Sequence, residues 1–342
     1  MKTVFDSEHS RHDPGFFLVK GSLQASTEQP ERAQRLLAGV ERLGLDVIAP
    51  TDYGDAARSA VHSRRYLDFL SVAHQQWTQL PGASNEVIAN IHPVEHPASY
   101  PQSIVGRAGW HMADTACPLG EFTFAAACGS ANSAVTATQC VIDGDQSAYA
   151  LCRPPGHHAY AERAGGFCFL NNTAIAAQHA RNIHERVAIL DVDVHHGNGT
   201  QGIFYNRPDV LTVSIHADPQ NFYPFFWGHT HETGVEEGQG YNLNLPLALG
   251  SGDDEFIRVL HEACARIEQF NPGILLIALG LDASEADPLR GLSVTTDGFE
   301  QIGRVIAEME RPTVLIQEGG YLSDLLTDNL AAVLSAFTRN NI

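Results

Sequence analysis

The chain has 342 residues, with 40 acidic and 21 basic side chains, so its formal net charge is −19. This charge argues against the basic surface that nucleic-acid binding requires, and it favours cationic small molecules as ligands. The N-terminus lacks the apolar stretch of a signal peptide, and no apolar run approaches the roughly 20 residues of a membrane helix. We therefore expect a globular cytoplasmic protein with neither nucleic acid nor a membrane as its partner.

Alternating strand and helix patterns extend along the chain. Apolar runs predict strands at residues 3–5, 148–152, 187–194, 210–215, 273–281 and 313–317. Helical patterns are found from about residue 28, from about residue 66, and at 125–142, 171–184, 253–270, 295–310 and 324–337. Residues 6–27 are predicted to form a loop, and residues 80–120 show no clear strand. Apolar strands that alternate with helices indicate a parallel sheet covered on both faces.

The six cysteines form no C-x-x-C pair, which indicates reduced thiols and leaves histidine and carboxylate side chains as the candidate metal ligands. The strand predicted at 187–194 ends in such groups. Side chains alternate along a strand, so Asp191, Asp193 and His195 are expected on one face. Two carboxylates and an imidazole predict a metal site, although a strand entering a polar loop has a similar pattern.

Chemically reactive side chains also follow three other predicted strands. His157 and His158 follow one strand, Asp282 follows another, and Tyr321 follows a third. In parallel sheets, ligands bind beyond the carboxyl ends of the strands. These groups are therefore expected to meet at a single site.

Five ordered motifs between about residues 150 and 325 resemble the zinc-dependent deacetylases, the family of histone deacetylases and their bacterial relatives. The motifs are RPPGHH (153–158), GFCFLNN (166–172), DVDVHHGNGT (191–200), LGLD (279–282) and EGGY (318–321). The resemblance implies an arginase/deacetylase-type α/β fold, an open parallel sheet with helices on both faces, as a single catalytic domain over residues 1–342. The segment at about 80–120 resembles the insertion of the acetylpolyamine amidohydrolases, which implies a homodimer with a narrowed active-site entrance.

The resemblance also implies roles for individual residues. Asp193, His195 and Asp282 would bind Zn²⁺, and this oxygen-rich set is also compatible with Fe²⁺ or Co²⁺. His157 would pair with Asp191. His158 would pair with Asn198, which is aspartate in some family members. Because a neutral amide raises imidazole basicity less than a carboxylate does, His158 is assigned as the general base. Tyr321 would donate a hydrogen bond to the oxyanion.

Two structural K⁺ sites are implied as well. The first would use Asp191, Asp193, His195, Ser214 and Ile215, and the second would use Phe204, Arg207, Val210 and Tyr241.

The substrate channel is expected to contain Gly166 and Phe167, with a second ring from residues 221–227. Phe225 is preferred over Phe222, Tyr223 and Phe226 as this ring. Asp114, Glu121 or Asp218 is a candidate to bind a distal ammonium group.

The leading hypothesis is therefore hydrolysis of N-acetylated polyamines and diamines, such as acetylputrescine and acetylcadaverine. A protein acetyl-lysine deacetylase is the alternative within enzymes. A catalytically silent metal-binding sensor or scaffold is the alternative outside enzymes, and the complete set of chemical positions argues against it. An arginase-type ureohydrolase is disfavoured, because such enzymes hold two manganese ions with more Asp and His ligands.

Overall fold

The computed structural model describes residues 1–93 and 99–339, and its main element is an eight-stranded parallel sheet. The spatial order of the strands is β4 (Asp46–Ile48), β1 (Lys2–Phe5), β5 (Ser147–Leu151), β10 (Thr313–Gln317), β9 (Ile274–Leu279), β6 (Val187–Asp191), β7 (Val210–Ala217) and β8 (Asn242–Leu247). A separate antiparallel hairpin consists of β2 (Phe16–Val19) and β3 (Ser22–Ala25). The sheet confirms the predicted fold class.

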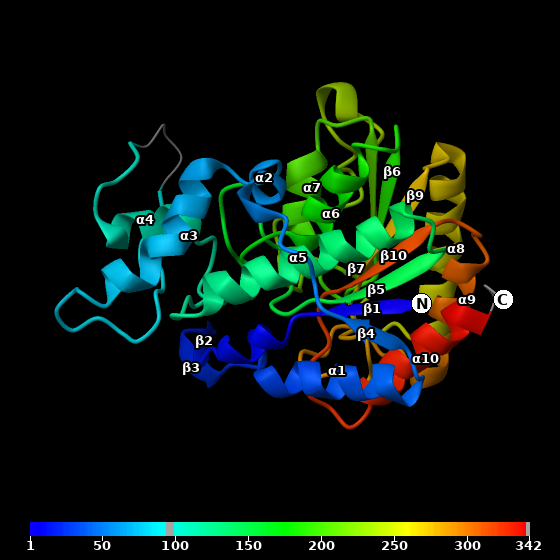
Figure 1. Cartoon of the computed structure of the whole chain (residues 1–342), viewed down its shortest axis with the longest axis horizontal. Helices are drawn as coiled ribbons and strands as arrows, with labels where there is room; N and C mark the ends of the chain where they lie inside the picture. The colour runs from blue at the N-terminus through cyan, green and yellow to red at the C-terminus, as the bar shows by residue number, and fades with distance from the viewer. Residues whose placement is uncertain (94–98, 340–342) are drawn as a thin grey trace.

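Helices cover both faces of the sheet (Figure 1). One face carries α5 (Thr123–Ile142), α6 (Asn172–Ala180) and α7 (Asn198–Phe204), and the other carries α1 (Pro30–Arg42), α8 (Asp253–Phe270), α9 (Thr296–Ala307) and α10 (Leu326–Arg339). Short 3₁₀ helices are found at η1 (Ser7–Arg11) and η2 (Glu236–Gly238). Beyond the first face, α3 (Arg64–Trp77) and α4 (Ile104–His111) lie toward one end of the molecule, and α2 (Gly54–Ser59) contacts α6.

The central strands are buried on both sides, which explains their continuous apolar sequences. Along β9, Leu275 and Ile277 pack into the core beneath α8, α9 and α10, whereas Ile274 and Leu276 pack beneath α5 and α6. This two-residue period is what a strand between two helical layers requires. Helix α5 contributes mainly small side chains, several of them alanines, to this face, where they pack with larger residues of the strands.

Several predicted boundaries were wrong. The strand expected to continue to residue 194 ends at Asp191. The loop expected at 6–27 contains the β2–β3 hairpin, whose residues are half-buried or exposed and therefore give no strong apolar signal. Strand β8 was missed because its sequence, NLNLPL, combines asparagine with proline, which sheets tolerate at an edge. Helix α4 was missed within 80–120, although that segment contains no named strand, as predicted.

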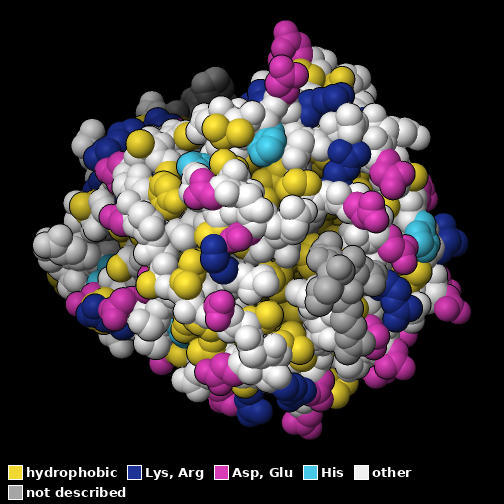
Figure 2. Space-filling model, turned by 45° about the vertical axis from the view of Figure 1, so that its right-hand side comes forward, with side chains coloured by type: hydrophobic (Ala, Val, Ile, Leu, Met, Phe, Trp, Pro, Cys, Tyr) yellow, Lys and Arg dark blue, Asp and Glu magenta, His cyan; other side chains and the backbone are white. Residues whose placement is uncertain are grey.

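The charged surface is mixed in sign. On the face shown in Figure 2, acidic side chains are interspersed with basic ones. Within the described part of the chain, no helix is long and apolar enough to cross a membrane.

Candidate active site

The site lies at the carboxyl ends of β5, β10, β9 and β6, which are neighbours in the sheet. Each of these strands is followed by a segment that carries candidate catalytic or metal-binding side chains. Because all four strands run in the same direction, residues 153–158, 192–196, 280–282 and 318–321 are brought to the same edge. The topology therefore joins motifs that are up to about half the chain apart in sequence.

Asp193, His195 and Asp282 are buried, and one ligating atom from each lies within 4.8 Å of the others. Backbone amides orient the two carboxylates. The Gly319 amide donates to Asp193 Oδ2 (2.7 Å), and the Val194 amide donates to Asp282 Oδ1 (3.0 Å). The His195 imidazole is left between the two carboxylates, with Nδ1 3.1 Å from Asp193 Oδ1 and 3.2 Å from Asp282 Oδ2.

This cluster fits a divalent metal ion. Asp282 Oδ2 is buried, and apart from the 3.2 Å contact with His195 Nδ1 it has no hydrogen-bond partner among the described residues. A Cβ atom added at Gly319 would lie 2.0 Å from that oxygen, so only glycine allows the turn to approach so closely. One imidazole and two carboxylates are a common ligand set for catalytic metals, which also keep positions open for water and substrate.

The grouping of Asp193 with His195 arises differently from the sequence prediction. Asp191 is the last residue of β6, and both other residues lie in the bends that follow. Here each side chain turns back onto a backbone amide: Asp191 Oδ1 accepts from the Asp193 amide (3.1 Å), and Asp193 Oδ1 accepts from the His195 amide (2.9 Å). Strand alternation was therefore the wrong reason for placing these residues together.

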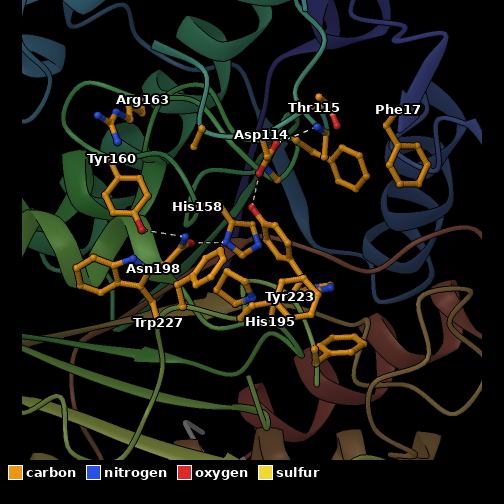
Figure 3. Close-up of a pocket in the computed structure, with 18 of the residues that line it drawn as sticks. Phe17, Asp114, Thr115, His158, Tyr160, Arg163, His195, Asn198, Tyr223 and Trp227 are labelled. Carbon is orange, nitrogen blue, oxygen red and sulfur yellow. Dashed lines mark hydrogen bonds between the residues drawn. The ribbon is translucent and has the colours of Figure 1, made fainter. Parts of the chain in front are cut away.

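The two histidines of the RPPGHH motif have different partners. His157 Nδ1 lies 2.9 Å from Asp191 Oδ2, whereas His158 Nδ1 lies 2.6 Å from Asn198 Oδ1. Asn198 Nδ2 in turn donates to the Tyr160 hydroxyl (3.0 Å; Figure 3). Since the amide oxygen can only accept, His158 carries its proton on Nδ1, and its Nε2 is left as the basic nitrogen.

These partners separate the protonation states of the two imidazoles. Burial lowers the pKa of His157, but the carboxylates of Asp193 and Asp191 outweigh it and raise the pKa to about 10. For His158, burial together with the positive charges of His157 and His195 lowers the pKa well below its ordinary value. The surroundings therefore shift the pKa values of the two imidazoles in opposite directions.

Tyr321 is presented by the turn after β10 and is 3% exposed. Its backbone amide donates to Asp287 Oδ2 (2.8 Å), and its ring lies 5.6 Å from the Phe167 ring. The buried Arg32 guanidinium donates to the carbonyls of Glu318 and Gly320 on the same turn. The sequence analysis did not identify Asp287 or Arg32, because neither lies in a motif and neither lies near Tyr321 in the sequence.

A buried ionic cluster supports the RPPGHH turn from behind. Glu28 Oε1 lies 2.8 Å from Arg153 Nε and 3.2 Å from Arg32 Nη1, and Glu28 Oε2 lies 3.3 Å from His12 Nε2. Burial alone would raise the pKa of Glu28, but Arg153, His12 and Arg32 outweigh it and lower the pKa to about 2. The sequence analysis did not bring these residues together: Arg153 belongs to the RPPGHH motif, but Glu28, Arg32 and His12 lie more than a hundred residues before it.

A cavity of about 1140 Å³ leads to these groups. Its walls include the rings of Phe17, Phe167 and Tyr223, and its inner end includes His158 and Tyr321. Figure 3 shows Phe17, Tyr223 and His158 around the cavity. Phe17 and Phe167 contact each other with ring centroids 5.3 Å apart. The cavity therefore combines an apolar wall with polar groups at its inner end, which is typical of a small-molecule site.

The second channel ring is better assigned to Tyr223 than to Phe225. Tyr223 lies edge-on to His158, with centroids 4.9 Å apart, whereas Phe222 stacks on His195 at 5.1 Å. Phe225 also lines the cavity but is 49% exposed, which places it toward solvent. The sequence analysis preferred Phe225, but local sequence does not determine the path of the loop, and that path decides which ring turns inward.

Asp114 ties the two walls of the channel together. Its Oδ2 accepts from the Tyr223 hydroxyl (2.6 Å) and from the Gly166 amide (3.1 Å; Figure 3). Gly166 and Phe167 both have positive φ angles, 51° and 68°, and the latter is uncommon for a bulky residue. The carboxylate thus stabilises the strained turn that carries Phe167.

The three acidic candidates for a distal ammonium group lie in different places. Asp114 lines the main cavity, but its oxygens already have partners. Glu121 lines a separate cavity of about 620 Å³, and the Asp218 carboxylate accepts from the Gln220 amide.

The residues of the two cation-site predictions also lie close together in the fold. Asp191 and Ser214 are in register on neighbouring strands, and Ile215 follows on β7. In the second set, the Arg207 amide donates to the Phe204 carbonyl (2.9 Å), Val210 begins β7, and the Tyr241 carbonyl accepts from the Thr212 amide (3.0 Å). Both sites remain predictions.

The segment at 80–120 contributes Asp114, Thr115 and Ala116 to the cavity wall. An isolated bridge between Val87 and Leu119 closes its base, and α4 lies between them in sequence. Residues 94–98 of this segment lie outside the described part of the chain.

Comparison with known proteins adds independent evidence for this architecture. Residues 26–337 match the model of the histone deacetylase domain. The chain is 45% identical over 338 residues to an acetylpolyamine amidohydrolase of Burkholderia pseudomallei (strain 1710b), covering 98% of each chain, and 36% identical to that of Mycoplana ramosa, again covering 98% of each. A crystal structure of acetylpolyamine aminohydrolase from Burkholderia pseudomallei superposes with a TM-score of 0.95, at 45% identity and 98% coverage of both chains. The chain therefore belongs to the histone deacetylase family.

Proposed function

We propose that this chain hydrolyses the acetyl amide of N-acetylated polyamines and diamines, releasing acetate and the free amine. The observation that carries the proposal is the aromatic-walled cavity that ends at His158, Tyr321 and the Asp193–His195–Asp282 cluster. Its walls suit a methylene chain, and aromatic faces attract a nearby cation. The names of the full-length relatives support the same substrate class.

Asp193, His195 and Asp282 would hold one divalent ion, which we propose to be Zn²⁺, with Fe²⁺ or Co²⁺ as compatible substitutes. When bound, such an ion supplies Lewis acidity, which polarises a carbonyl and lowers the pKa of water. The chain's own contribution is to keep the two carboxylates oriented through the Gly319 and Val194 amides.

His158 is proposed as the general base, because its Nε2 is left unprotonated by the Asn198 contact at Nδ1. It accepts a proton from the attacking water, and the departing amine then receives a proton from one of the two imidazoles. His157, held by Asp191, supplies positive charge beside the reaction. Proton transfer of this kind contributes about 10²–10⁴-fold to rate.

Tyr321 is proposed to donate a hydrogen bond to the oxygen that develops negative charge. Its ring is fixed by Phe167, and its backbone is held through Asp287 and Arg32, so the hydroxyl is oriented before substrate arrives. Phe167 and Tyr223 would flank the substrate chain, with Gly166 at the turn between them and Phe225 at the outer end.

The remaining expectations are part of the same proposal. We propose that the two predicted K⁺ sites stabilise the region around the neighbouring strands β6 and β7. We also propose that the chain forms a homodimer in which the 80–120 segment lies at the entrance of the active site. Light scattering of the purified protein tests the dimer, and dialysis against K⁺-free buffer with a thermal melt tests the cation sites. The six cysteines are free, which supports a reducing compartment such as the cytoplasm.

A substrate panel tests the proposed function. Metal-loaded protein is assayed with acetylputrescine, acetylcadaverine, acetylspermidine and an acetyl-lysine peptide, with a Tyr321→Phe variant as the control for background hydrolysis. The proposal predicts a higher kcat/KM for at least one small amine than for the peptide. A strong preference for the peptide would instead support a protein deacetylase, and no turnover of any amide would support a silent metal-binding relative.

A further inference from the structure

Glu318 is a fully buried carboxylate that the proposed reaction does not use. It follows β10 directly, and its side chain points toward the histidine turn rather than the metal cluster. Oε2 accepts from the backbone amides of Gly156 (2.5 Å) and His157 (3.0 Å), and Oε1 accepts from the Thr173 hydroxyl (2.9 Å). Three donors therefore converge on one carboxylate, and two of them belong to the turn that carries both catalytic imidazoles.

Glu318 also belongs to the turn that carries Tyr321. Its neighbour Gly319 donates to Asp193 Oδ2, and its own carbonyl accepts from Arg32. The backbone of Glu318 is thus fixed in the turn that carries Tyr321, while its side chain is hydrogen-bonded to the turn that carries His157. No other described carboxylate accepts hydrogen bonds from the amides of both Gly156 and His157.

A metal-binding role for this group is disfavoured by the same contacts. His157, Cys168 and Glu318 offer ligating atoms within 4.8 Å of one another. However, His157 Nδ1 is already bound to Asp191, and the Cys168 thiol donates to the Gly166 carbonyl (3.4 Å). Both Glu318 oxygens also have donors. The local chemistry is that of a hydrogen-bonded anchor.

We propose that Glu318 is a positioning residue that fixes the His157–His158 turn relative to Tyr321. This inference rests on the proposed function, in which the base and the oxyanion donor act on the same amide. The three hydrogen bonds require the length of the glutamate side chain and do not require its charge. A displacement of catalytic groups by about 1 Å can cost on the order of 10²-fold in rate.

Two substitutions of Glu318 distinguish the effect of side-chain length from that of charge. Glu318→Gln keeps the length of the side chain and removes the charge. Its amide oxygen can still accept from both backbone amides, and the Thr173 hydroxyl can reverse to accept from the amide nitrogen. Glu318→Asp keeps the charge but shortens the side chain by one methylene group, so it cannot hold all three donors. The two variants are complementary, because Glu318→Asp changes the length of the side chain and keeps its charge, whereas Glu318→Gln keeps the length.

The experiment measures kcat and KM for both variants, normalised to folded, metal-loaded protein by circular dichroism and elemental analysis. The proposal predicts that Glu318→Asp loses at least about tenfold in kcat with KM within about twofold, and that Glu318→Gln stays within about threefold of wild type. A wild-type kcat for Glu318→Asp, or a larger loss for Glu318→Gln than for Glu318→Asp, would overturn it. A purely structural role would lower the melting temperature and leave normalised kcat unchanged.

A second readout does not depend on turnover. The backbone amide resonances of Gly156 and His157 report their hydrogen bonds directly in nuclear magnetic resonance spectra. They should move upfield further in Glu318→Asp, which cannot hold all the donors, than in Glu318→Gln, whose amide oxygen still accepts from both amides. Unchanged resonances in Glu318→Asp would contradict the proposal. If the wild type cleaves only the acetyl-lysine peptide, the polyamine assignment fails, while the ranking of the two variants on that peptide still tests Glu318.

Discussion

The inner and outer ends of the cavity are built on different physical principles. At the inner end, His157, Asp193 and Tyr321 are buried, and each is held by a hydrogen bond to a residue at or beyond the carboxyl end of another strand. At the outer end, Phe225 and Phe226 are 49% and 83% exposed, and Arg163 faces solvent. Buried polar groups are costly to leave unpaired, whereas exposed side chains are replaced at little cost. The inner end should therefore determine the chemistry, and the outer end should select among substrates.

The largest expected effect is on the ionic cluster behind the inner end. Glu28→Gln leaves Arg153 and Arg32 buried without their anion, which should reduce the free energy of unfolding by about 3–5 kcal/mol. Chemical denaturation of the variant and the wild type measures this difference.

The difference in the free energy of unfolding between wild type and Glu28→Gln should depend on pH, because Glu28 titrates. Its pKa is about 2 in the folded chain and near 4.5 ordinarily, so its contribution is fully present above about pH 4.5 and is lost as the pH falls toward 2. The stability gap between wild type and Glu28→Gln should narrow over that window. A constant gap would show that Glu28 is not the group that titrates.

The next largest effect is on catalysis. Tyr321→Phe removes one hydroxyl from the inner end and should lower kcat by about 10²–10³-fold, because a preorganised oxyanion donor is lost. Its metal content and melting temperature should match those of wild type, since the hydroxyl is not among the cluster's ligating atoms. Turnover near the wild-type level would remove Tyr321 from the mechanism.

Tyr223 lies between the two ends and should show an intermediate effect. Tyr223→Phe keeps the ring but removes the hydrogen bond to Asp114, which holds the Gly166–Phe167 turn. A hydrogen bond to a charged group such as this carboxylate contributes about 1.5–3 kcal/mol. We expect KM to rise by about tenfold with a smaller change in kcat. The double variant Tyr223→Phe/Asp114→Asn should show the same rise in KM as Tyr223→Phe alone, because both changes break the same hydrogen bond. If the rise in the double variant equalled the combined effects of the two single variants, the two groups would act independently and the prediction would be contradicted.

The smallest effect is expected at the outer end. Arg163 lines the cavity and should weakly repel the distal ammonium of a diamine substrate. Arg163→Gln should therefore lower KM for acetylputrescine by about twofold, in keeping with the weak energies of exposed charges. An uncharged N-alkylacetamide of equal length serves as the control and should be unaffected. A rise in KM for acetylputrescine would contradict the prediction, because it would mean that Arg163 favours binding of this substrate.

The sequence predicted the inner end better than the outer end for a physical reason. Asp191, Asp193 and His195 are adjacent in one motif, and Asp282 and Tyr321 each follow an apolar strand, so the parallel topology brings them together. The contacts of His157 and His158 follow from the same motifs. Their roles in the reaction remain proposals.

The supporting and outer residues depended on long-range packing that local patterns do not encode. Arg153 meets Glu28 and Arg32 across more than a hundred residues of sequence, and no local spacing indicates this contact. The choice of Tyr223 over Phe225 depended on the path of one loop. The strand boundary at Asp191 was also misplaced, because the side chains that follow it bond back to the backbone instead of continuing the sheet.

The most direct test of the account is the metal content of the purified chain. Elemental analysis after reconstitution with Zn²⁺ should find one tightly bound ion per chain in the wild type. Asp282→Asn should lose that ion, while Tyr321→Phe should retain it. Two ions per wild-type chain, or a full ion in Asp282→Asn, would contradict a single centre held by Asp193, His195 and Asp282.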